Sequence, residues 1–449
     1  MGVSGKSVAL PDRITQADLA AVSDNPNKES SKPYLAELLK LRDKEGRDNA
    51  LIHYVVAGWA LPVKVTLDDQ AMKTTLEQGW NPQSAKLLPI LESCQIALGE
   101  VRKGAALDYA KGIGFDQEKY KLMPDFQGIF FPLARLLCVE GRYFENQGQY
   151  SKALDNYLTA LTLGRDCGGA DQTLIGNLIS IAAQNATLKP MGDLVTGGHL
   201  ARPDLEKAAT RLKQIQKTTV SLRGVIEGEA ACESANFRAV AVKLKQGLEI
   251  AQKVGKNPDD VLKETLKEVY GTAGQNMIQS IPLPILQGMG KDLDKVTAKY
   301  DEMVKFNMEL ADTPFWKRDF NRENQDIQRL FASLHLIAQT GQSNYMDPGV
   351  RHTIRQTKVF GAQLQIALEL SRLDKRRYPG QLSELVPTYF EAVPLDPFCG
   401  APFAYFVTAD GKGYNFFSVG PDKKTGPVNV IYDVKSGLFS QGDIPFGKQ

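Results

Sequence analysis

The sequence lacks most of the residue patterns that mark catalytic and metal sites. Its five cysteines stand far apart and include no C-x-x-C pair, so neither a disulfide framework nor a zinc site is indicated, and we interpret them as small buried hydrophobic residues. The four histidines form no H-E-x-x-H or similar ligand spacing, and no G-x-S-x-G elbow, kinase signature or G-x-G-x-x-G fingerprint occurs. We therefore expect no cofactor, and we interpret His53, on an apolar helix, as a hydrogen-bonded core residue.

An excess of charge of one sign is also missing. The chain carries 54 basic and 52 acidic residues, which leaves a net charge of +2 and no sequence-wide field for capturing nucleic acid or an anionic membrane surface. Hydrophobic residues make up 43% and charged residues 24%, which is typical of a globular protein. At 449 residues the chain is expected to form two or three folding units.

Long apolar runs are absent as well. The amino end has no uninterrupted apolar stretch, and the GKS sequence there lacks the rest of a phosphate loop, so residues 1–32 are predicted to be a flexible leader. The apolar run Tyr54–Val63 has about half the length needed to cross a bilayer and is predicted to be a buried helix. Contact with a membrane is expected only through an anchor that this chain does not contain.

What the sequence has in abundance is helical spacing of apolar residues. In the stretch 134–165, Gly141 and Ala153 stand where two helices must approach closely, Tyr157 fills the gap between them, and Gly148-Gln149-Tyr150 makes the turn. This pattern resembles one tetratricopeptide repeat without its final proline. A single repeat cannot bury its own face, so neighbouring helices are expected to pack on it.

The resemblance implies a groove lined by the first helix of the repeat. By position, the side chains expected to face this groove and to hold a protein or peptide partner are Arg135, Arg142, Glu145 and Asn146. Arginines in a groove could receive a peptide carboxylate. The alternative, that these residues form an ordinary solvated helix face, stays open.

The end of the chain changes character. Five prolines between Tyr378 and Pro402 rule out further helix and route the chain toward a sheet. Two aromatic runs, FAYFV and YNFFSV, are joined through Asp410-Gly411, which is a hairpin signal. A third strand is predicted in VNVIYDV, residues 428–434, because a lone hairpin is marginal in water.

The order of motifs from residue 354 to 426 (a helix, RYP, LVP, VPLDPF.G.P and Y...SVGPD) resembles the carboxy-terminal domain of the type II secretion major pseudopilin. Together with the upstream repeat, the chain resembles a family of uncharacterised bacterial envelope proteins that usually carry an amino-terminal membrane anchor. Major pseudopilins bind calcium in the loop after the sheet. Here that loop offers Asp422 and carbonyl groups but no cluster of carboxylates, so Asp422 is the one candidate metal ligand.

These patterns predict a mainly helical protein with a tetratricopeptide-like body and a small carboxy-terminal α+β domain made of a helix and a short antiparallel sheet. The predicted divisions are residues 1–32, 33–200, 201–345 and 350–449. The expected function is non-catalytic protein binding or scaffolding in the bacterial periplasm or cell envelope. The alternatives are an enzyme, such as a hydrolase with a dispersed site in a helical cleft, a structural component of a surface assembly, and a cytoplasmic location.

Overall fold

The structure is a computed structural model in which part of the chain is described. The described residues are 26–62, 69–114, 128–170, 172–257, 260–261, 264, 293–333, 346–425, 431, 440 and 442–448. Most of the predicted leader, most of the predicted strand 428–434 and the side chain of His335 lie outside this set.

The described residues fall into two compact units. The first contains residues up to Ser221 and the segment from Met346 onward, and the second contains residues 222–345. The boundary near 345 coincides with a predicted division. The division at 200 does not, since the next helix belongs to the first unit, and the carboxy-terminal segment packs with the first 221 residues rather than alone.

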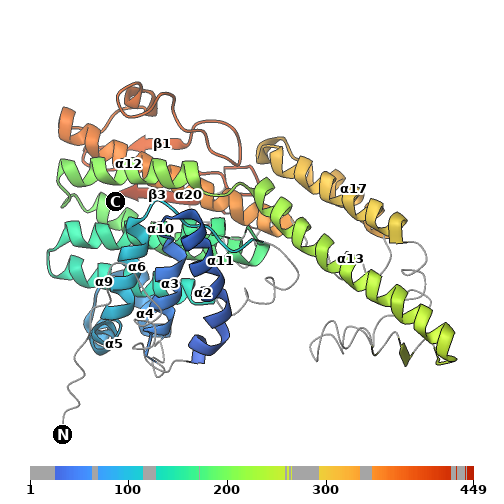
Figure 1. Cartoon of the computed structure of the whole chain (residues 1–449). Helices are drawn as coiled ribbons and strands as arrows, with labels where there is room; N and C mark the ends of the chain where they lie inside the picture. The colour runs from blue at the N-terminus through green and yellow to red at the C-terminus, as the bar shows by residue number, and fades with distance from the viewer. Residues whose placement is uncertain are drawn as a thin grey trace, which may run out of the picture. The chain divides into compact units, whose positions relative to one another are not determined.

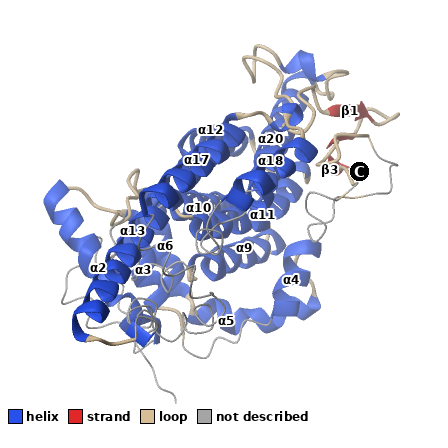
Figure 2. Ribbon diagram, turned by 90° about the vertical axis from the view of Figure 1, so that its right-hand side faces the viewer, coloured by secondary structure: helices blue, strands red, loops and turns tan. Residues whose placement is uncertain are grey.

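Helices account for most of the first unit (Figures 1 and 2). The helical elements are α2 (Pro26–Glu45), α3 (Ala50–Trp59), α4 (Asp69–Gln78), η1 (Pro82–Leu87), α5 (Leu88–Ser93), α6 (Gln95–Ala106), α9 (Phe130–Asn146), α10 (Tyr150–Ala170), α11 (Leu174–Thr196), α12 (Arg202–Thr218), α20 (Met346–Lys375) and η3 (Leu382–Leu385). The strands are β1 (Ala404–Val407), β2 (Tyr414–Ser418) and β3 (Ile444–Lys448). The predicted combination of a mainly helical protein with a small antiparallel sheet is confirmed.

The helix pair predicted in 134–165 is present as α9 and α10. A Cβ atom at Gly141 would lie 2.6 Å from a ring carbon of Tyr157, so the two helices meet where only glycine fits. Ala153 is fully buried, as a helix crossing requires. Helix α11 packs against α9 and α10, so the pair buries its face on a neighbour, as expected.

Helix α3 is buried along its whole length and contains residues 54–59 of the predicted run Tyr54–Val63, with the helix ending at Trp59. The side chain of Asn49 accepts a hydrogen bond from the Leu51 amide and caps its first turn. His53 is 3% exposed, and its Nδ1 lies 3.0 Å from Glu100 Oε2 on α6. His53 is therefore a hydrogen-bonded core residue, as predicted. Across the described part of the chain, no helix combines the length and apolar character that crossing a membrane requires.

The small sheet packs on α20. Its strand order is β1-β2-β3 with antiparallel pairing, and alternate residues of β2, Tyr414 and Phe416, are buried while Asn415 points away. The predicted hairpin between β1 and β2 is present, and Gly411 in its turn has a φ of +68°. The buried aromatic side chains form one cluster with Leu364 and Leu368 of α20.

The third strand differs from the expectation. β3 pairs with β2 from Ile444 to Lys448 rather than from residues 428–434. Of the predicted segment only Ile431 is described, and it forms a single parallel bridge with Asp443. The predicted β-branched run is therefore not the strand that completes the described sheet.

The regular elements among the described residues of the second unit are all helices. This unit contains α13 (Leu222–Val254), α17 (Leu293–Asp312), η2 (Phe315–Lys317) and α18 (Phe320–Ser333). Arg223 on α13 forms ion pairs with Glu227 and with Asp312 on α17. Arg318 and Glu323 form a buried bidentate pair at the start of α18, with an Nη2–Oε2 distance of 2.7 Å.

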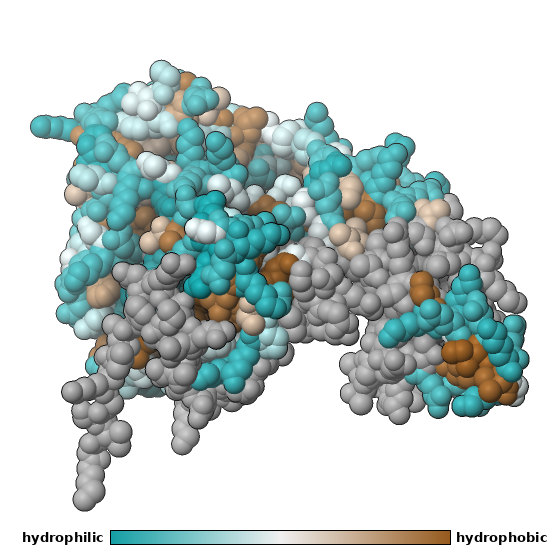
Figure 3. All heavy atoms as spheres, in the orientation of Figure 1, coloured by the Kyte–Doolittle hydropathy of each residue, from teal (hydrophilic) through white to brown (hydrophobic). Residues whose placement is uncertain are grey.

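Hydrophilic residues cover most of the described surface of the first unit that faces the viewer in Figure 3, and the hydrophobic patches among them are small. This is the ordinary surface of a globular protein. A binding site is therefore better sought in hollows between elements than on an exposed apolar face.

Candidate functional site

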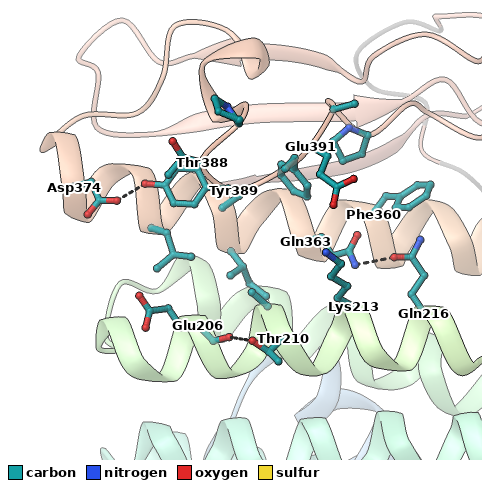
Figure 4. A pocket seen from close by; sticks show the side chains of 18 of the residues that line it. Glu206, Thr210, Lys213, Gln216, Phe360, Gln363, Asp374, Thr388, Tyr389 and Glu391 are labelled. Atoms are coloured by element: carbon teal, nitrogen blue, oxygen red, sulfur yellow. Dashed lines mark hydrogen bonds between the residues drawn. The ribbon is translucent and has the colours of Figure 1, made fainter.

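A groove runs between α12, α20 and the proline-rich segment Pro387–Pro394. We call it the α12–α20 groove, and its volume is about 790 Å³. Figure 4 shows side chains from all three segments pointing into it. A volume of this size lies within the range of ligand-binding clefts in proteins, which is ~300–1,000 Å³.

Polar contacts join the two helices at both ends of the groove. Arg202, in the first turn of α12, forms an ion pair with Asp374 near the end of α20, and the Tyr389 hydroxyl donates to the same carboxylate. At the other end, Gln363 Nε2 donates to Gln216 Oε1 at 2.9 Å. Because the start of one helix meets the end of the other, α12 and α20 run antiparallel along the groove.

The floor of the groove is apolar. Ile366, Ala367 and Leu370 of α20 line it and are at most 6% exposed, so their buried side chains give it a rigid base. Phe360 extends this surface toward the Gln216 end (Figure 4), and Phe390 of the proline-rich segment also lines the groove. A ligand that enters the groove would bury apolar groups against these side chains.

Two oppositely charged side chains face the groove from its two walls. Lys213 on α12 and Glu391 on the proline-rich segment are both exposed, and Figure 4 shows both of them directed into the space between the walls. Neither has a hydrogen-bond or ion-pair partner within the part of the chain that the structure describes. They are the groove's two free charges in that part.

The remaining charges of the groove are paired with one another. Arg202 Nη1 donates to Glu206 Oε1 at 3.1 Å, in addition to its pair with Asp374. Burial raises the pKa of Tyr389, and the positive charge of Arg202 partly opposes this effect. The phenol therefore stays protonated at neutral pH and keeps its hydrogen bond to Asp374.

Arg142, the first of the residues predicted to bind a partner, lies elsewhere and is not exposed. It is 3% exposed, and its guanidinium donates to Leu76 O at 3.0 Å and to the carboxylates of Glu145 and Asp193. Burial works against its charge, but Tyr157 and the two carboxylates outweigh burial and raise the pKa. The expectation that Arg142 faces an open groove is wrong, because it ties α9 to α11 and to the end of α4.

The other three residues do not join Arg142 in one open surface. Glu145 is half-buried and accepts hydrogen bonds from Arg142 and from the Tyr157 hydroxyl. Arg135 is half-buried, with its Cζ 5.7 Å from the centre of the Phe131 ring. Asn146 is exposed at the last position of α9. Their predicted role in binding stays a prediction.

The candidate calcium ligand Asp422 is half-buried, and its Oδ1 accepts a hydrogen bond from the Lys424 amide at 3.1 Å. Among the described residues, no group of three or more His, Cys, Asp or Glu side chains is placed to hold a metal ion. Residues 426–430 of the same loop lie outside the described set.

One further cluster of ionisable groups is buried, and its members are hydrogen-bonded to one another. The Tyr54 hydroxyl donates to Asp166 Oδ2 at 2.7 Å, and Arg165 Nε donates to Asp166 Oδ1 at 2.7 Å. Burial raises the pKa of Asp166, although Arg165 partly opposes the shift. Because Tyr54 belongs to α3 and the other two residues to α10, this cluster fastens those helices together.

The sequence patterns do not indicate the α12–α20 groove. The lining residues come from three segments, of which α12 and α20 lie more than a hundred residues apart in the sequence. Individually, Lys213 and Glu391 look like solvated surface charges. The only local feature of the sequence that marks the groove is the high proportion of prolines in the segment that forms one of its walls.

Comparisons with protein-family models, with curated proteins and with solved structures find no match to this chain.

Proposed function

We propose that this protein is a non-catalytic binding protein that holds an extended peptide segment of a partner in the α12–α20 groove. The observation that carries the proposal is the groove itself, which follows α12 from Arg202 to Gln216, has an apolar floor and is bounded by polar contacts at both ends. Apolar floors with a few polar groups are how proteins take up short segments of other chains.

The length and volume of the groove favour an extended peptide over a helix as its occupant. Along α12 the axis rises by ~21 Å between Arg202 and Gln216, at ~1.5 Å per residue. An extended chain advances ~3.3 Å per residue, so about six residues match that length. A helix of the same length with a diameter of ~10 Å would fill roughly 1,600 Å³, about twice the volume of the groove.

The two free charges define the chemistry of the segment. A partner with one acidic residue toward Lys213 and one basic residue toward Glu391, which face each other across the groove in Figure 4, would satisfy both, with its apolar side chains farther along the floor. Both charges are exposed, so each pair would contribute modestly to affinity and mainly fix direction and register.

The wider role is scaffolding in the bacterial cell envelope. This part of the proposal rests on the resemblance of the chain to envelope proteins that combine a tetratricopeptide-like body with a pseudopilin-like end. The α9–α10 pair, with its glycine contact, and the three-stranded sheet packed on α20 are compatible with those two parts.

The test uses an array of eight-residue peptides that combine apolar residues with one acidic and one basic residue. We expect a subset with a fixed order of charges to bind the wild-type protein. Thr210→Trp places a large side chain inside the groove from an exposed position and should abolish binding. Lys217→Trp, on the same helix but outside the groove, is the matched control and should bind like the wild type.

The proposal fails if no peptide binds, or if Thr210→Trp binds the selected peptides as tightly as the wild type. Circular dichroism of both variants checks that α12 is intact. Because both substituted positions are exposed, we expect changes in stability within about 0.5 kcal/mol.

A further inference from the structure

A second site is indicated by basic side chains that lack counter-charges. His352, Arg355 and Lys358 follow one another at three-residue spacing, so they lie on one face of α20. The other strongly buried arginines of the first unit, such as Arg142 and Arg165, have an acidic partner. These three do not have one within the described part of the chain.

Arg355 is the most unusual of the three. It is 6% exposed, its Nη2 lies 3.1 Å from His352 Nε2, and its Nε is buried without a hydrogen-bond partner among the described residues. Burial lowers the pKa of Arg355 to about 10, so the guanidinium is still charged at pH 7. A buried charge without a partner destabilises the folded state, and a bound anion would relieve that cost.

Lys358 lines a cavity of about 730 Å³ between α11, α20 and β2–β3, which we call the α11–α20 cavity. Burial lowers the pKa of Lys358 as well. The cavity also receives Lys189 from α11 and the amide groups of Gln365 and Asn415. Its hydrogen-bond donors therefore come from three different elements.

The one carboxylate in the cavity does not cancel these charges. Asp193 lies 3.1 Å from Lys189 Nζ and also accepts from Arg142, so it is already shared between two cations. Lys358, and Arg355 one helical turn away, keep their positive charge uncompensated. On the opposite wall, Ile444 and Phe446 of β3 provide apolar surface.

We propose that the α11–α20 cavity binds a small organic anion, with its phosphate or carboxylate group on Lys358 and Lys189 and its apolar part on Phe446 and Ile444. Lys358 contacts the anionic group directly. Arg355 adds positive potential from the preceding turn of α20 and is a positioning residue. Ligand and peptide would occupy different hollows of the same unit, one on each side of α20.

Two probes distinguish the anionic groups. Phenyl phosphate and benzoate are titrated calorimetrically into the protein, with benzyl alcohol as the uncharged analogue, in a Tris buffer at constant ionic strength. We expect saturable binding of one or both anions and none of the alcohol. Lys358→Met should weaken anion binding by ~10- to 100-fold, because it removes a charge-assisted contact.

Lys358→Arg keeps the charge and should retain most of the affinity, and Lys217→Met, at an exposed position of α12 outside both hollows, should leave it unchanged. If Lys358→Met does not fold, Lys189→Met takes its place, because that side chain is 57% exposed. The inference is overturned if neither anion binds saturably, if removal of either cavity lysine leaves the affinity unchanged, or if benzyl alcohol binds as tightly as the anions.

Discussion

At the scale of single residues, the surroundings of a side chain are set by partners that are distant in sequence. Arg142 has the spacing of a groove-facing arginine on α9, but its partners Leu76 and Asp193 lie on other helices. No local pattern distinguishes a solvated arginine from one that three elements enclose. His53 was easier to predict, since an uninterrupted apolar helix indicates burial wherever its partner lies.

Arg142→Ala is therefore expected to destabilise the protein by about 3 kcal/mol, because it removes the buried guanidinium that joins α9 to α4 and α11 and leaves the half-buried Glu145 without its cation. Arg135→Ala, two turns earlier on the same helix, is the control, with an expected loss below about 1 kcal/mol. Urea denaturation measures both. Equal midpoints for the two variants would show that the Arg142 contacts carry no stability.

The stability change on Lys358→Met should depend on pH. The folded-state pKa of Lys358 is depressed by burial, so between that pKa and about 10.5 the unfolded chain binds more protons and the wild type gains stability as pH rises. Below the folded-state pKa, the wild type bears the full cost of burying the charge. The variant has no such cost and should be the more stable protein at pH 7.

That advantage should shrink as the pH approaches 10.5. The charged groups around Lys358 are Arg355 on its own helix and Lys189 and Asp193 on α11, and the variant keeps all three. Urea denaturation at pH 7 and pH 10, in buffers without phosphate or carboxylate, gives the difference in free energy of unfolding between the variant and the wild type at each pH. The same difference at both pH values would contradict a buried charged lysine.

At the scale of elements, the sequence predicts well what rests on periodicity. The small-large alternation of α9 and α10, the apolar run of α3 and the aromatic hairpin of β1 and β2 are all local signals. The third strand was misplaced because VNVIYDV is rich in β-branched residues, whereas β3, IPFGK, contains a proline and a glycine. β3 is an edge strand, and a proline is tolerated there because its open side makes no hydrogen bonds to another strand. The contact of β3 with α20 also favours this segment as the third strand.

Gly361→Ala tests that contact between α20 and β3. A Cβ at Gly361 would lie 2.2 Å from a ring carbon of Phe446, so the helix and the strand must move apart. We expect a loss of about 1 to 3 kcal/mol, as for overpacking in general. Gly99→Ala in α6 is the matched control, because a Cβ there meets nothing within 4 Å.

With no steric cost, Gly99→Ala should stabilise the protein by about 0.5 to 1 kcal/mol through the higher helix propensity of alanine. The two substitutions are thus expected to have opposite signs in the same thermal or urea denaturation. A stabilising Gly361→Ala would show that β3 does not pack on α20 at this position.

At the scale of the whole molecule, the first unit is built from two separate parts of the chain, because the segment from Met346 onward packs with the residues before 222. Length and composition predicted more than one folding unit. They could not show that α20 and the sheet complete the unit formed by residues before 222, since that depends on packing of α20 against α11 and α12. The α12–α20 groove exists only because of this packing.

Removal of residues 222–345, with a flexible glycine-serine linker from Ser221 to Met346, should leave the first unit folded. Its core, including the cluster of Leu364, Phe403 and Phe416, lies wholly within the retained residues. We expect a single cooperative thermal transition and retained binding of the selected peptides. A shortened chain without a cooperative transition would contradict the division into two compact units.

The central claim, that the α12–α20 groove holds an extended peptide, is tested most directly by exchanging charges across the groove. The affinity of a selected peptide is measured by fluorescence anisotropy with the wild type and with Lys213→Glu, and then with a peptide whose acidic residue is replaced by lysine. We expect the variant to bind the original peptide at least about tenfold more weakly and the lysine peptide more tightly than the wild type does. Equal affinities in all four combinations would contradict the account.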